Sequence, residues 1–178
     1  MERAVTLEII GHAIVSADGR IADADRLMPD ALRNEKDWAR FQEALDGSAL
    51  VVLGRLGHEA HPNPGRRRVV VTSRVAALEP GDDLVTLWNP AGMSFEDAAR
   101  ALGVTTGHVA VTGGQGVFDL FLPLFTRFDL VTSDAILLPL GVPCFSGGWP
   151  DDVLAGAGLR ITEREILDPG VRLQVWRR

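Results

Sequence analysis

The stretch that most constrains the fold is an apolar run that meets a pair of glycines and continues as an amphipathic run. It reads Val109-Ala-Val-Thr-Gly-Gly-Gln-Gly-Val-Phe-Asp-Leu-Phe-Leu122. This pattern predicts a buried strand that ends at Thr112, a glycine turn, and a helix that begins directly after the turn. Free backbone N–H groups at a helix start suit a phosphate, and glycine lets a ligand reach the main chain because it lacks a Cβ. The spacing alone leaves two interpretations open: a dinucleotide pyrophosphate site and an ordinary strand-to-helix turn.

The size and composition of the chain indicate an ordinary globular protein. With 178 residues, 46% of them hydrophobic, we expect a single domain that spans residues 1–178. The net charge of −6 argues against general nucleic-acid binding, and no apolar stretch is long enough to cross a bilayer. The N-terminal residues lack the apolar core of a signal peptide, and the single Cys144 cannot form an internal disulfide. These features predict a cytoplasmic protein that binds neither nucleic acid nor membrane.

Two further helices are expected from apolar spacing and capping residues. The segment 35–46 has apolar residues three and four positions apart, which predicts a buried helical stripe formed by Trp38, Phe41 and Leu45. Ser94 is expected to cap the other helix, because acidic residues follow it in the first turn. The polar segment 16–34 between the first strand and the first helix is expected to be a loop.

Short apolar runs predict the strands of a mostly parallel sheet. They lie at residues 5–15, 49–53, 68–72, 84–88 and 128–132, the last extending toward residue 138. The last two runs, 159–167 and 171–177, alternate apolar and polar residues around an Asp-Pro-Gly turn, which predicts an antiparallel hairpin. The expected fold class is therefore α/β, with antiparallel strands at one end of the sheet.

Six motifs stand in the chain in a fixed order. They are Ser16-Ala-Asp-Gly-Arg-Ile-Ala22, Asp37-Trp-Ala-Arg-Phe41, Val52-Leu-Gly-Arg55, Pro64-Gly-Arg66 with Val69-Val-Val-Thr-Ser-Arg74, Thr112-Gly-Gly-Gln-Gly-Val-Phe118 and Gly141-Val-Pro-Cys-Phe145. Their order resembles the dihydrofolate reductase superfamily, which includes the reductase domain of the riboflavin-pathway enzyme RibD. The resemblance covers residue 10 to about residue 145. It implies a three-layer sandwich, in which helices cover both faces of the central sheet and the C-terminal hairpin closes it.

The resemblance also implies hydride transfer from NADPH, since no amino-acid side chain can deliver a hydride. It places the pyrophosphate on Gly113, Gly114, Gln115, Gly116, Val117 and Phe118, with a peptide bond between the first two that is expected to be cis. It places the second half of the nucleotide on Gly54 and Arg55. It places an adenosine 2′-phosphate on Thr72, Ser73 and Arg74, whose hydroxyls and guanidinium suit a dianion, so NADPH is expected rather than NADH.

For the substrate, the resemblance implies a site built around Asp37. A carboxyl against aromatic surface has a raised pKa, which suits proton donation or the orientation of a ring nitrogen. The residues alone instead favour a surface aspartate near a helix start, stabilised by the helix dipole. Ile14 and Phe41 are expected to contact the substrate, and Arg66 to bind its carboxylate or sugar phosphate. The substrate is expected to be a pterin, a pyrimidine or a related heterocycle.

Some residues depart from the pattern of the superfamily or suggest other chemistry. Leu56-Gly57 stands where folate reductases usually have a basic residue and threonine, and Phe118 stands where tyrosine is usual. His58-Glu59-Ala60-His61 lacks the spacing of a zinc site, so no metal is expected. His12 is expected to be a core histidine. A single cysteine also excludes the zinc deaminase half of bifunctional RibD proteins.

Three readings of the function stay open at this point. Two are enzymes, a dihydrofolate reductase and a 5-amino-6-(5-phosphoribosylamino)uracil reductase, and both use NADPH. The third is a non-catalytic nucleotide-binding protein of the same fold, and the altered Leu56-Gly57 turn supports this reading. A homodimer that pairs through sheet edges is also expected, because riboflavin-type relatives commonly pair in this way.

Overall fold

The computed structural model describes residues 4–178, and these residues form one nine-stranded sheet in the order β10-β11-β8-β1-β7-β3-β4-β6-β5. The six central strands run parallel: β1 (Thr6–Ser16), β3 (Leu50–Gly54), β4 (Arg68–Val71), β6 (Val85–Trp88), β7 (Thr106–Val111) and β8 (Arg127–Ser133). Antiparallel strands close both edges: β5 (Leu78–Pro80) on one side, β10 (Arg160–Asp168) and β11 (Val171–Arg177) on the other. A separate two-stranded sheet pairs β2 (Arg20–Ala22) with β9 (Val142–Pro143).

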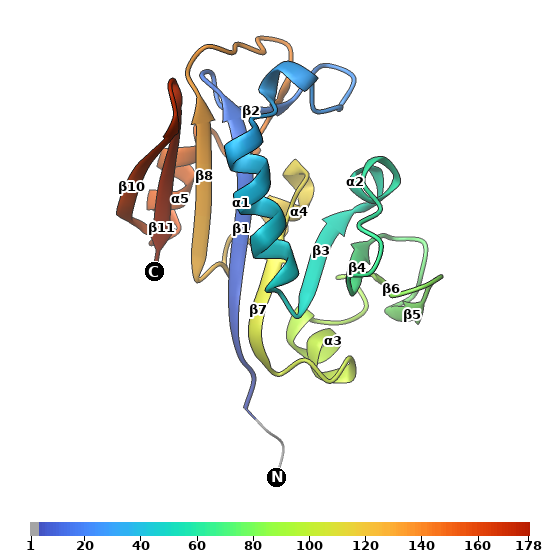
Figure 1. The fold of residues 1–178 in the computed structure, drawn as a ribbon. Coiled ribbons are helices and arrows are strands. Elements are labelled where there is room, and N and C mark those ends of the chain that lie inside the picture. The colour runs from blue at the N-terminus through green and yellow to red at the C-terminus, as the bar shows by residue number, and fades with distance from the viewer. Residues whose placement is uncertain (1–3) are drawn as a thin grey trace.

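Helices cover both faces of the large sheet (Figure 1). They are α1 (Glu35–Asp46), α2 (Arg55–Ala60), α3 (Phe95–Ala101), α4 (Gln115–Phe121) and α5 (Pro150–Gly156). In β3, Val51 and Leu53 pack with Leu45 of α1, whereas Val52 between them packs with the cluster that contains α3, α4 and α5. Because successive side chains of a strand point to opposite faces, this alternation shows that the central strands are buried on both sides. The expected three-layer α/β architecture is therefore confirmed.

The predicted C-terminal hairpin is also confirmed, but four details of the sequence-based fold are wrong. Antiparallel pairing occurs at both edges of the sheet, because the short and largely exposed β5 pairs with β6. The segment 16–34 contains β2 and a 3₁₀ helix at Asp30–Leu32 rather than loop alone. The strand expected to run toward residue 138 ends at Ser133. The short helices α2 and α5 were not expected, although Pro150 at the start of α5 and the acidic residues after it are typical helix-start signals.

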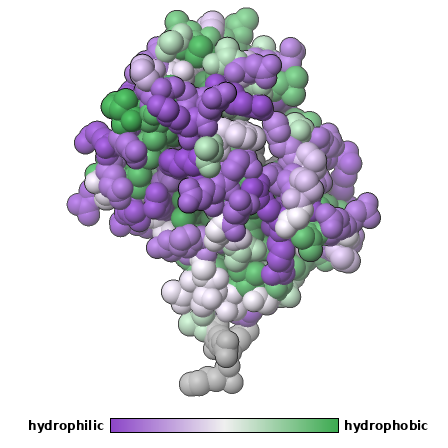
Figure 2. All heavy atoms as spheres, in the orientation of Figure 1, coloured by the Kyte–Doolittle hydropathy of each residue, from purple (hydrophilic) through white to green (hydrophobic). Residues whose placement is uncertain are grey.

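The molecular surface is mostly hydrophilic on the face that carries α1 (Figure 2). None of the helices within residues 4–178 has the length and apolar character needed to cross a membrane. Cys144 is fully buried in the core cluster between the sheet, α4 and α5, and burial raises the pKa of its thiol far above the ordinary value. Its thiol is therefore neutral and shielded from reagents in solution.

Candidate active site

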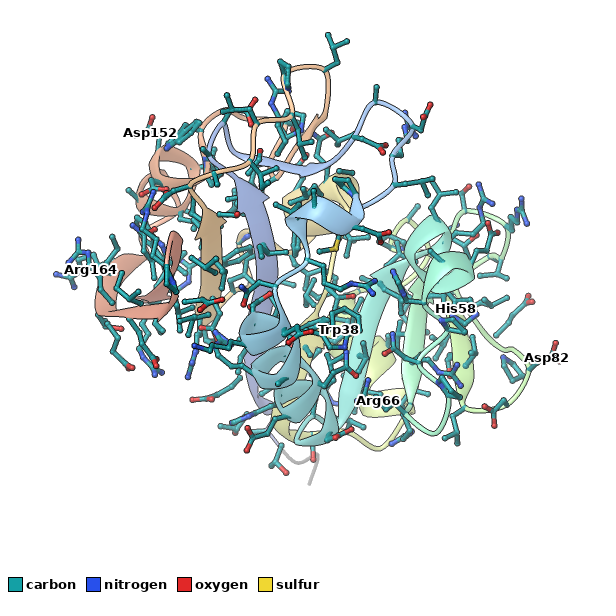
Figure 3. All side chains as sticks on the ribbon, turned by 45° about the horizontal axis from the view of Figure 1, so that its top comes forward. Trp38, His58, Arg66, Asp82, Asp152 and Arg164 are labelled. Atoms are coloured by element: carbon teal, nitrogen blue, oxygen red, sulfur yellow. The ribbon has the colours of Figure 1, made fainter. Side chains whose placement is uncertain are left out.

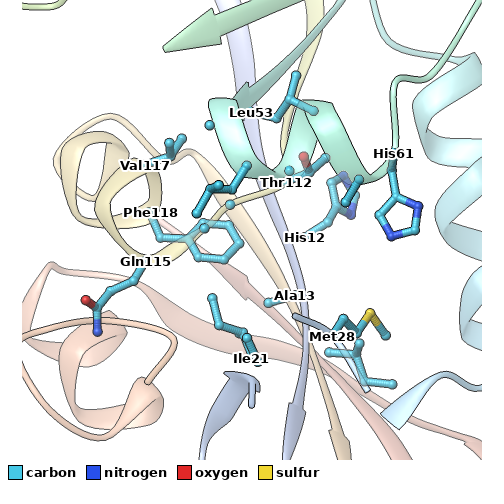
Figure 4. A pocket seen from close by; sticks show the side chains of 18 of the residues that line it. His12, Ala13, Ile21, Met28, Leu53, His61, Thr112, Gln115, Val117 and Phe118 are labelled. Atoms are coloured by element: carbon cyan, nitrogen blue, oxygen red, sulfur yellow. The ribbon is translucent and has the colours of Figure 1, made fainter. Parts of the chain in front are cut away.

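A cavity of about 810 Å³ lies on the face of the sheet that carries α1, at the carboxyl ends of β3, β4 and β7. This is the edge at which ligands bind in parallel α/β sheets. The middle of β1 forms its floor with His12, Ala13 and Ile14, while β2 and β9 close it opposite α2. Figure 4 shows His12 and Ala13 of β1 between the side chains of α4 and those of Met28 and His61. The cavity volume is that of a typical small-molecule site.

The glycine turn forms one wall of the cavity. The peptide bond between Gly113 and Gly114 is cis, as the resemblance implies, and Gly113 has a φ of 100°. A Cβ on Gly113 would lie 2.9 Å from the ring of Phe118, so both its conformation and its neighbour require glycine. The amide of Gly54 donates a 3.0 Å hydrogen bond to the carbonyl of Gly113, which joins the ends of β3 and β7. The two glycine-containing motifs are thus held side by side.

Two glycines of this turn have open surroundings on the side of the missing side chain. A Cβ added to Gly114 or Gly116 would meet nothing within 4 Å, and both residues line the cavity. No side chain caps the start of α4 at Gly114. The side-chain amide of Gln115 donates a 3.2 Å hydrogen bond to the carbonyl of Pro143 in β9, so it ties the turn to the opposite wall. An extended group that approaches the main chain closely would therefore fit here.

The other residues expected to bind the cofactor differ in their burial and in whether they line the cavity. Val117 and Phe118 are buried, and the Phe118 ring packs edge-on against Phe128, with 5.4 Å between the ring centroids. Arg55 lines the cavity and forms an exposed ion pair with Glu59 at 2.9 Å. Residues 72–74 follow β4 next to the Gly54 end of β3, but they do not line the cavity. Within them, the Arg74 amide donates a 3.2 Å hydrogen bond to the Thr72 hydroxyl.

Asp37 lines the same cavity as the glycine turn. Asn34 caps α1 by accepting hydrogen bonds from the amides of Lys36 and Asp37, which fixes the first turn of the helix. Burial raises the pKa of the Asp37 carboxyl to about 6, with Arg40 opposing the shift and Asp129 adding to it. Among the described residues, none donates a hydrogen bond to this carboxyl group. Phe41, one helical turn later, and Ile14 of β1 line the same cavity, so the structure brings these three expected substrate residues together.

Behind Asp37 lies a buried cluster of charged groups that the sequence analysis did not identify. Asp129 of β8 is 3% exposed and pairs with Arg40 of α1 at 3.0 Å and with Arg127 at 2.7 Å. His12 of β1 has its Nδ1 atom 3.8 Å from the Asp129 carboxylate, and burial lowers the pKa of its ring to about 4. His12 was expected to be a core histidine, and it is indeed buried, but it also lines the cavity. A signal was present, because His12 and Asp129 each stand between apolar residues in the middle part of a strand.

Arg66 does not line this cavity. It lines a second, more open hollow of about 430 Å³ that shares Trp38 and His61 with the first. Its guanidinium donates two hydrogen bonds to Asp46, at 3.0 and 2.7 Å, and others to Gln42 and Asn63. In Figure 3, Arg66 lies beside the C-terminal half of α1, consistent with these bonds. The structure therefore shows the Arg66 guanidinium hydrogen-bonded within the protein and outside the cavity that contains Asp37.

Trp38 is also placed differently from the sequence-based expectation. It was expected to belong to the buried stripe of α1, but the core cluster under this helix contains Leu45 and Phe41 without it. Instead, Trp38 is half-buried at the cavity wall, where its ring lies 5.9 Å from Phe41 and 6.1 Å from His61. The guanidinium of Arg33 stacks over it at 4.6 Å. Helical spacing could not separate a core position from a cavity position, because both face the sheet.

Comparison with known proteins gives a curated relative and several solved structures. No protein-family model matches the sequence. The chain is 35% identical over 125 residues to "Dihydrofolate reductase HdrB" of Haloferax volcanii, a match that covers 67% of this chain and 62% of the relative. The chain thus spans less than two thirds of that relative's length.

Three solved structures share the fold at low sequence identity. A putative riboflavin biosynthesis protein from Shewanella sp. PV-4 aligns with a TM-score of 0.69 at 19% identity, covering 96% of this chain and 98% of that one. A diaminohydroxyphosphoribosylaminopyrimidine deaminase/5-amino-6-(5-phosphoribosylamino)uracil reductase from Thermotoga maritima aligns with a TM-score of 0.68 at 19% identity, covering 97% of this chain and 56% of that one. Dihydrofolate reductase from Enterococcus faecalis, complexed with NADP(H) and RAB-propyl, aligns with a TM-score of 0.67 at 17% identity, covering 96% of each chain.

These findings agree with the motifs on which the resemblance was based. The structural neighbours establish the fold, and the curated relative adds a match in sequence over most of the chain. The glycine turn with its cis bond and the cavity that it faces lie within the same architecture. The chain therefore has the dihydrofolate reductase-like fold and is similar to dihydrofolate reductases and to reductases of the RibD type.

Proposed function

We propose that this protein is an NADPH-dependent reductase that transfers hydride to a pterin, a pyrimidine or a related heterocycle. One observation carries the proposal: a single cavity has the open glycine turn on one wall and an unpaired, partly buried carboxyl on another. The similarity to dihydrofolate reductase and to RibD-type reductases supports the same activity. The first need of such an enzyme is a nicotinamide cofactor, because protein side chains do not transfer hydride.

The residues around the glycine turn fit NADPH. Gly114 and Gly116 leave room for a pyrophosphate against the main chain, and Gly54 with Arg55 lies beside them at the end of β3. Thr72, Ser73 and Arg74 follow β4 at the same sheet edge, where two hydroxyls and a guanidinium suit a 2′-phosphate. Bound there, NADPH would supply the hydride. The residues of the chain would hold it with its nicotinamide toward the floor formed by β1.

Asp37 is the group that we assign to the substrate. With a pKa of about 6, its carboxyl donates a proton below that pH and accepts an N–H hydrogen bond from a ring above it. Phe41 and Ile14 form the apolar walls that would hold a flat heterocycle beside it. Since Arg66 is engaged with Asp46, Gln42 and Asn63, we infer that binding does not depend on a carboxylate tail held by Arg66. Dihydrofolate and a ribosylaminopyrimidine are both candidate substrates.

We further infer that the protein acts in the cytoplasm as a homodimer. The free edge of β10 supports the dimer, because among the described residues this strand pairs only with β11. Ile166 on β10 is 70% exposed, which also suits a partner strand. Light scattering coupled to size-exclusion chromatography tests this inference, and a monomer at micromolar concentration would contradict it.

The proposed activity is tested in two steps. Calorimetric titration with NADPH and with NADH should show binding of NADPH and a clear preference for it, and Arg74→Gln should reduce that preference. Loss of nicotinamide absorbance should then occur with one member of a panel of dihydropterins and aminopyrimidines. Binding of NADPH without oxidation by any member of the panel would instead favour the non-catalytic nucleotide-binding reading. Absence of NADPH binding would contradict both readings.

A further inference from the structure

The buried carboxylate of Asp129 lines the cavity and binds two arginines, of which Arg40 also lines the cavity. Its Oδ1 atom accepts a 2.7 Å hydrogen bond from Arg127 Nε, and its Oδ2 atom accepts bonds of 3.0 Å from Arg127 Nη2 and Arg40 Nη2. His12 lies 3.8 Å from Oδ2. The carboxylate is 3% exposed, and its two guanidinium partners compensate for its burial.

Arg40 stands between two carboxyl groups and pairs with only one of them. It follows Asp37 by three positions on α1, a spacing at which side chains on one helix face can meet. Its hydrogen bond nevertheless goes across to Asp129 on β8. All three residues line the cavity, and among the described residues the Asp37 carboxyl has no hydrogen-bond donor. An Asp–Arg pair at the surface of a helix is weak, whereas the charge-assisted bond to a buried carboxylate is strong, which explains this choice of partner.

We propose that Asp129 is a positioning residue, which holds Arg40 against the sheet so that the Asp37 carboxyl stays unpaired and free to bind the heterocyclic substrate. The proposal rests on the proposed function for the role of Asp37. Its structural part, which is the competition of two carboxyl groups for Arg40, can be measured without substrate. Asp129 itself would act through Arg40 and not on the reacting atoms.

The charged groups around Asp37 act in opposite directions. Arg40 of α1 lowers the pKa of Asp37 while Asp129 of β8 raises it, and burial is the largest cause of its rise to about 6. Arg127 of β8 and His12 of β1 face Asp129, and the His12 ring is neutral above about pH 4. At the start of α1, the Nζ atom of Lys36 forms an ion pair with Oδ1 of Asp168 in β10, 3.2 Å away. Removing Asp129 should therefore lower the pKa of Asp37 for two reasons. It removes a negative neighbour, and it releases the Arg40 cation.

The test is a carbon NMR titration of the side-chain carboxyl groups in protein labelled at aspartate, with the Asp37 signal assigned from Asp37→Asn. In Asp129→Asn, the titration midpoint of Asp37 should fall by about one unit or more, because an arginine within a few ångströms stabilises the carboxylate. The pH at which kcat/KM changes should fall by the same amount. An Asp37 midpoint equal to that of the wild type, in a folded variant, would overturn the proposal.

Arg40→Gln gives the opposite expectation and covers the case in which Asp129→Asn does not fold. Without the cation, and with Asp129 still in place, the Asp37 midpoint should rise, whereas Arg40→Lys should keep it near the wild-type value. General loosening of the site would hydrate Asp37 and lower its midpoint in every variant, so the rise in Arg40→Gln separates positioning from loss of packing. A midpoint that falls or stays unchanged in Arg40→Gln would overturn the proposal. The His12 ring is followed in parallel, because Arg40 also lowers its pKa.

The reductase activity and the positioning role of Asp129 can be tested separately. If the wild-type protein binds NADPH but reduces no heterocycle, the proposed function fails, while the NMR midpoints still decide whether Asp129 keeps Arg40 from Asp37. If turnover is found and the midpoints of Asp129→Asn and wild type agree, the function stands and the positioning role is wrong.

Discussion

At the scale of single residues, the site depends on an aspartate whose charge is not paired by the protein. Asp37 could be singled out in the sequence because it stands four positions before Phe41 in a predicted helix. The groups around it could not, because Arg40, Asp129 and His12 come from three segments that only the sheet brings together. Arg66 could also be singled out in the sequence, by its position after Pro64-Gly65. Its hydrogen bond to Asp46, which lies 20 positions earlier, could not be predicted from that position.

Replacing the Asp37 carboxyl with an amide should reduce turnover and leave cofactor binding intact. General acid–base groups contribute about 10²- to 10⁴-fold, so Asp37→Asn is expected to lower kcat by a factor in that range. Steady-state kinetics with the identified substrate measures this loss, and an NADPH titration should give the same Kd as wild type. Glu43→Gln, an exposed change on the same helix, serves as the control. A kcat for Asp37→Asn within a factor of two of the wild-type value would remove Asp37 from the mechanism.

The same substitution should stabilise the protein at alkaline pH. Because the folded-state pKa of Asp37 is raised to about 6 from 3.8, its contribution to stability is fully present below the unfolded pKa and is lost as the pH rises through 6. Asp37→Asn cannot ionise, so at pH 8 it should exceed the wild type in free energy of unfolding by up to about 3 kcal/mol. Urea denaturation at pH 8 and pH 4 checks this, and the advantage should shrink at the lower pH. If the difference in free energy of unfolding between the two proteins did not change with pH, the raised pKa of Asp37 would be refuted.

At the scale of elements, the turn between β7 and α4 was the most predictable part of the site. A turn that requires glycine can be recognised in a sequence, because few other residues tolerate a positive φ or so close an approach of the ring of Phe118. Short elements leave weaker traces. Three-residue β5 and six-residue α2 are too brief to show a period, and α5 was recognisable only by its Pro150 start. Thus long strands could be placed from the sequence, while these three short elements could not.

Gly116→Ala should separate ligand binding from folding. An added Cβ meets no protein atom within 4 Å, and alanine is the better helix former, so stability should be unchanged or slightly higher. The methyl group would occupy the side of the turn on which we place the pyrophosphate, so NADPH should bind at least about tenfold more weakly. Gly156→Ala in α5, a helical glycine with equally open surroundings outside the cavity, should leave the affinity unchanged. Equal NADPH affinity in both variants would place the cofactor elsewhere.

At the scale of the whole molecule, aromatic rings on the face opposite α1 hold the layers together. Phe121 of α4 is fully buried and contacts Trp88, Phe95 and Phe125, with ring centroids 5.9, 4.9 and 6.3 Å away. It does not line the cavity. The global architecture could be predicted from the order of apolar runs and motifs, because a strand buried on both faces requires helices on both faces. The closure of the far edge by β5 could not, since its pairing is decided by tertiary contact rather than by local pattern.

Phe121→Ala should therefore weaken the whole fold without changing the site. Truncation of a buried phenylalanine costs about 3–5 kcal/mol, which urea denaturation of the variant measures directly. Where the variant is folded, its affinity for NADPH should match that of the wild type. Leu124→Ala, at a residue 44% exposed in the turn that follows α4, should cost far less. A loss of similar size in the two variants would contradict the assignment of Phe121 to the core.

The burial of Cys144 has a practical consequence for how motion in this molecule can be observed. The chain has no other thiol, and this one is enclosed between the sheet and two helices, where it remains protonated. Maleimide reagents act on exposed thiolates, so the natural protein should remain unmodified by them under native conditions. A cysteine placed at any exposed position then becomes a unique attachment point for a fluorophore or spin label. Distances across the mouth of the cavity can thus be followed with labels while the natural residue stays in place.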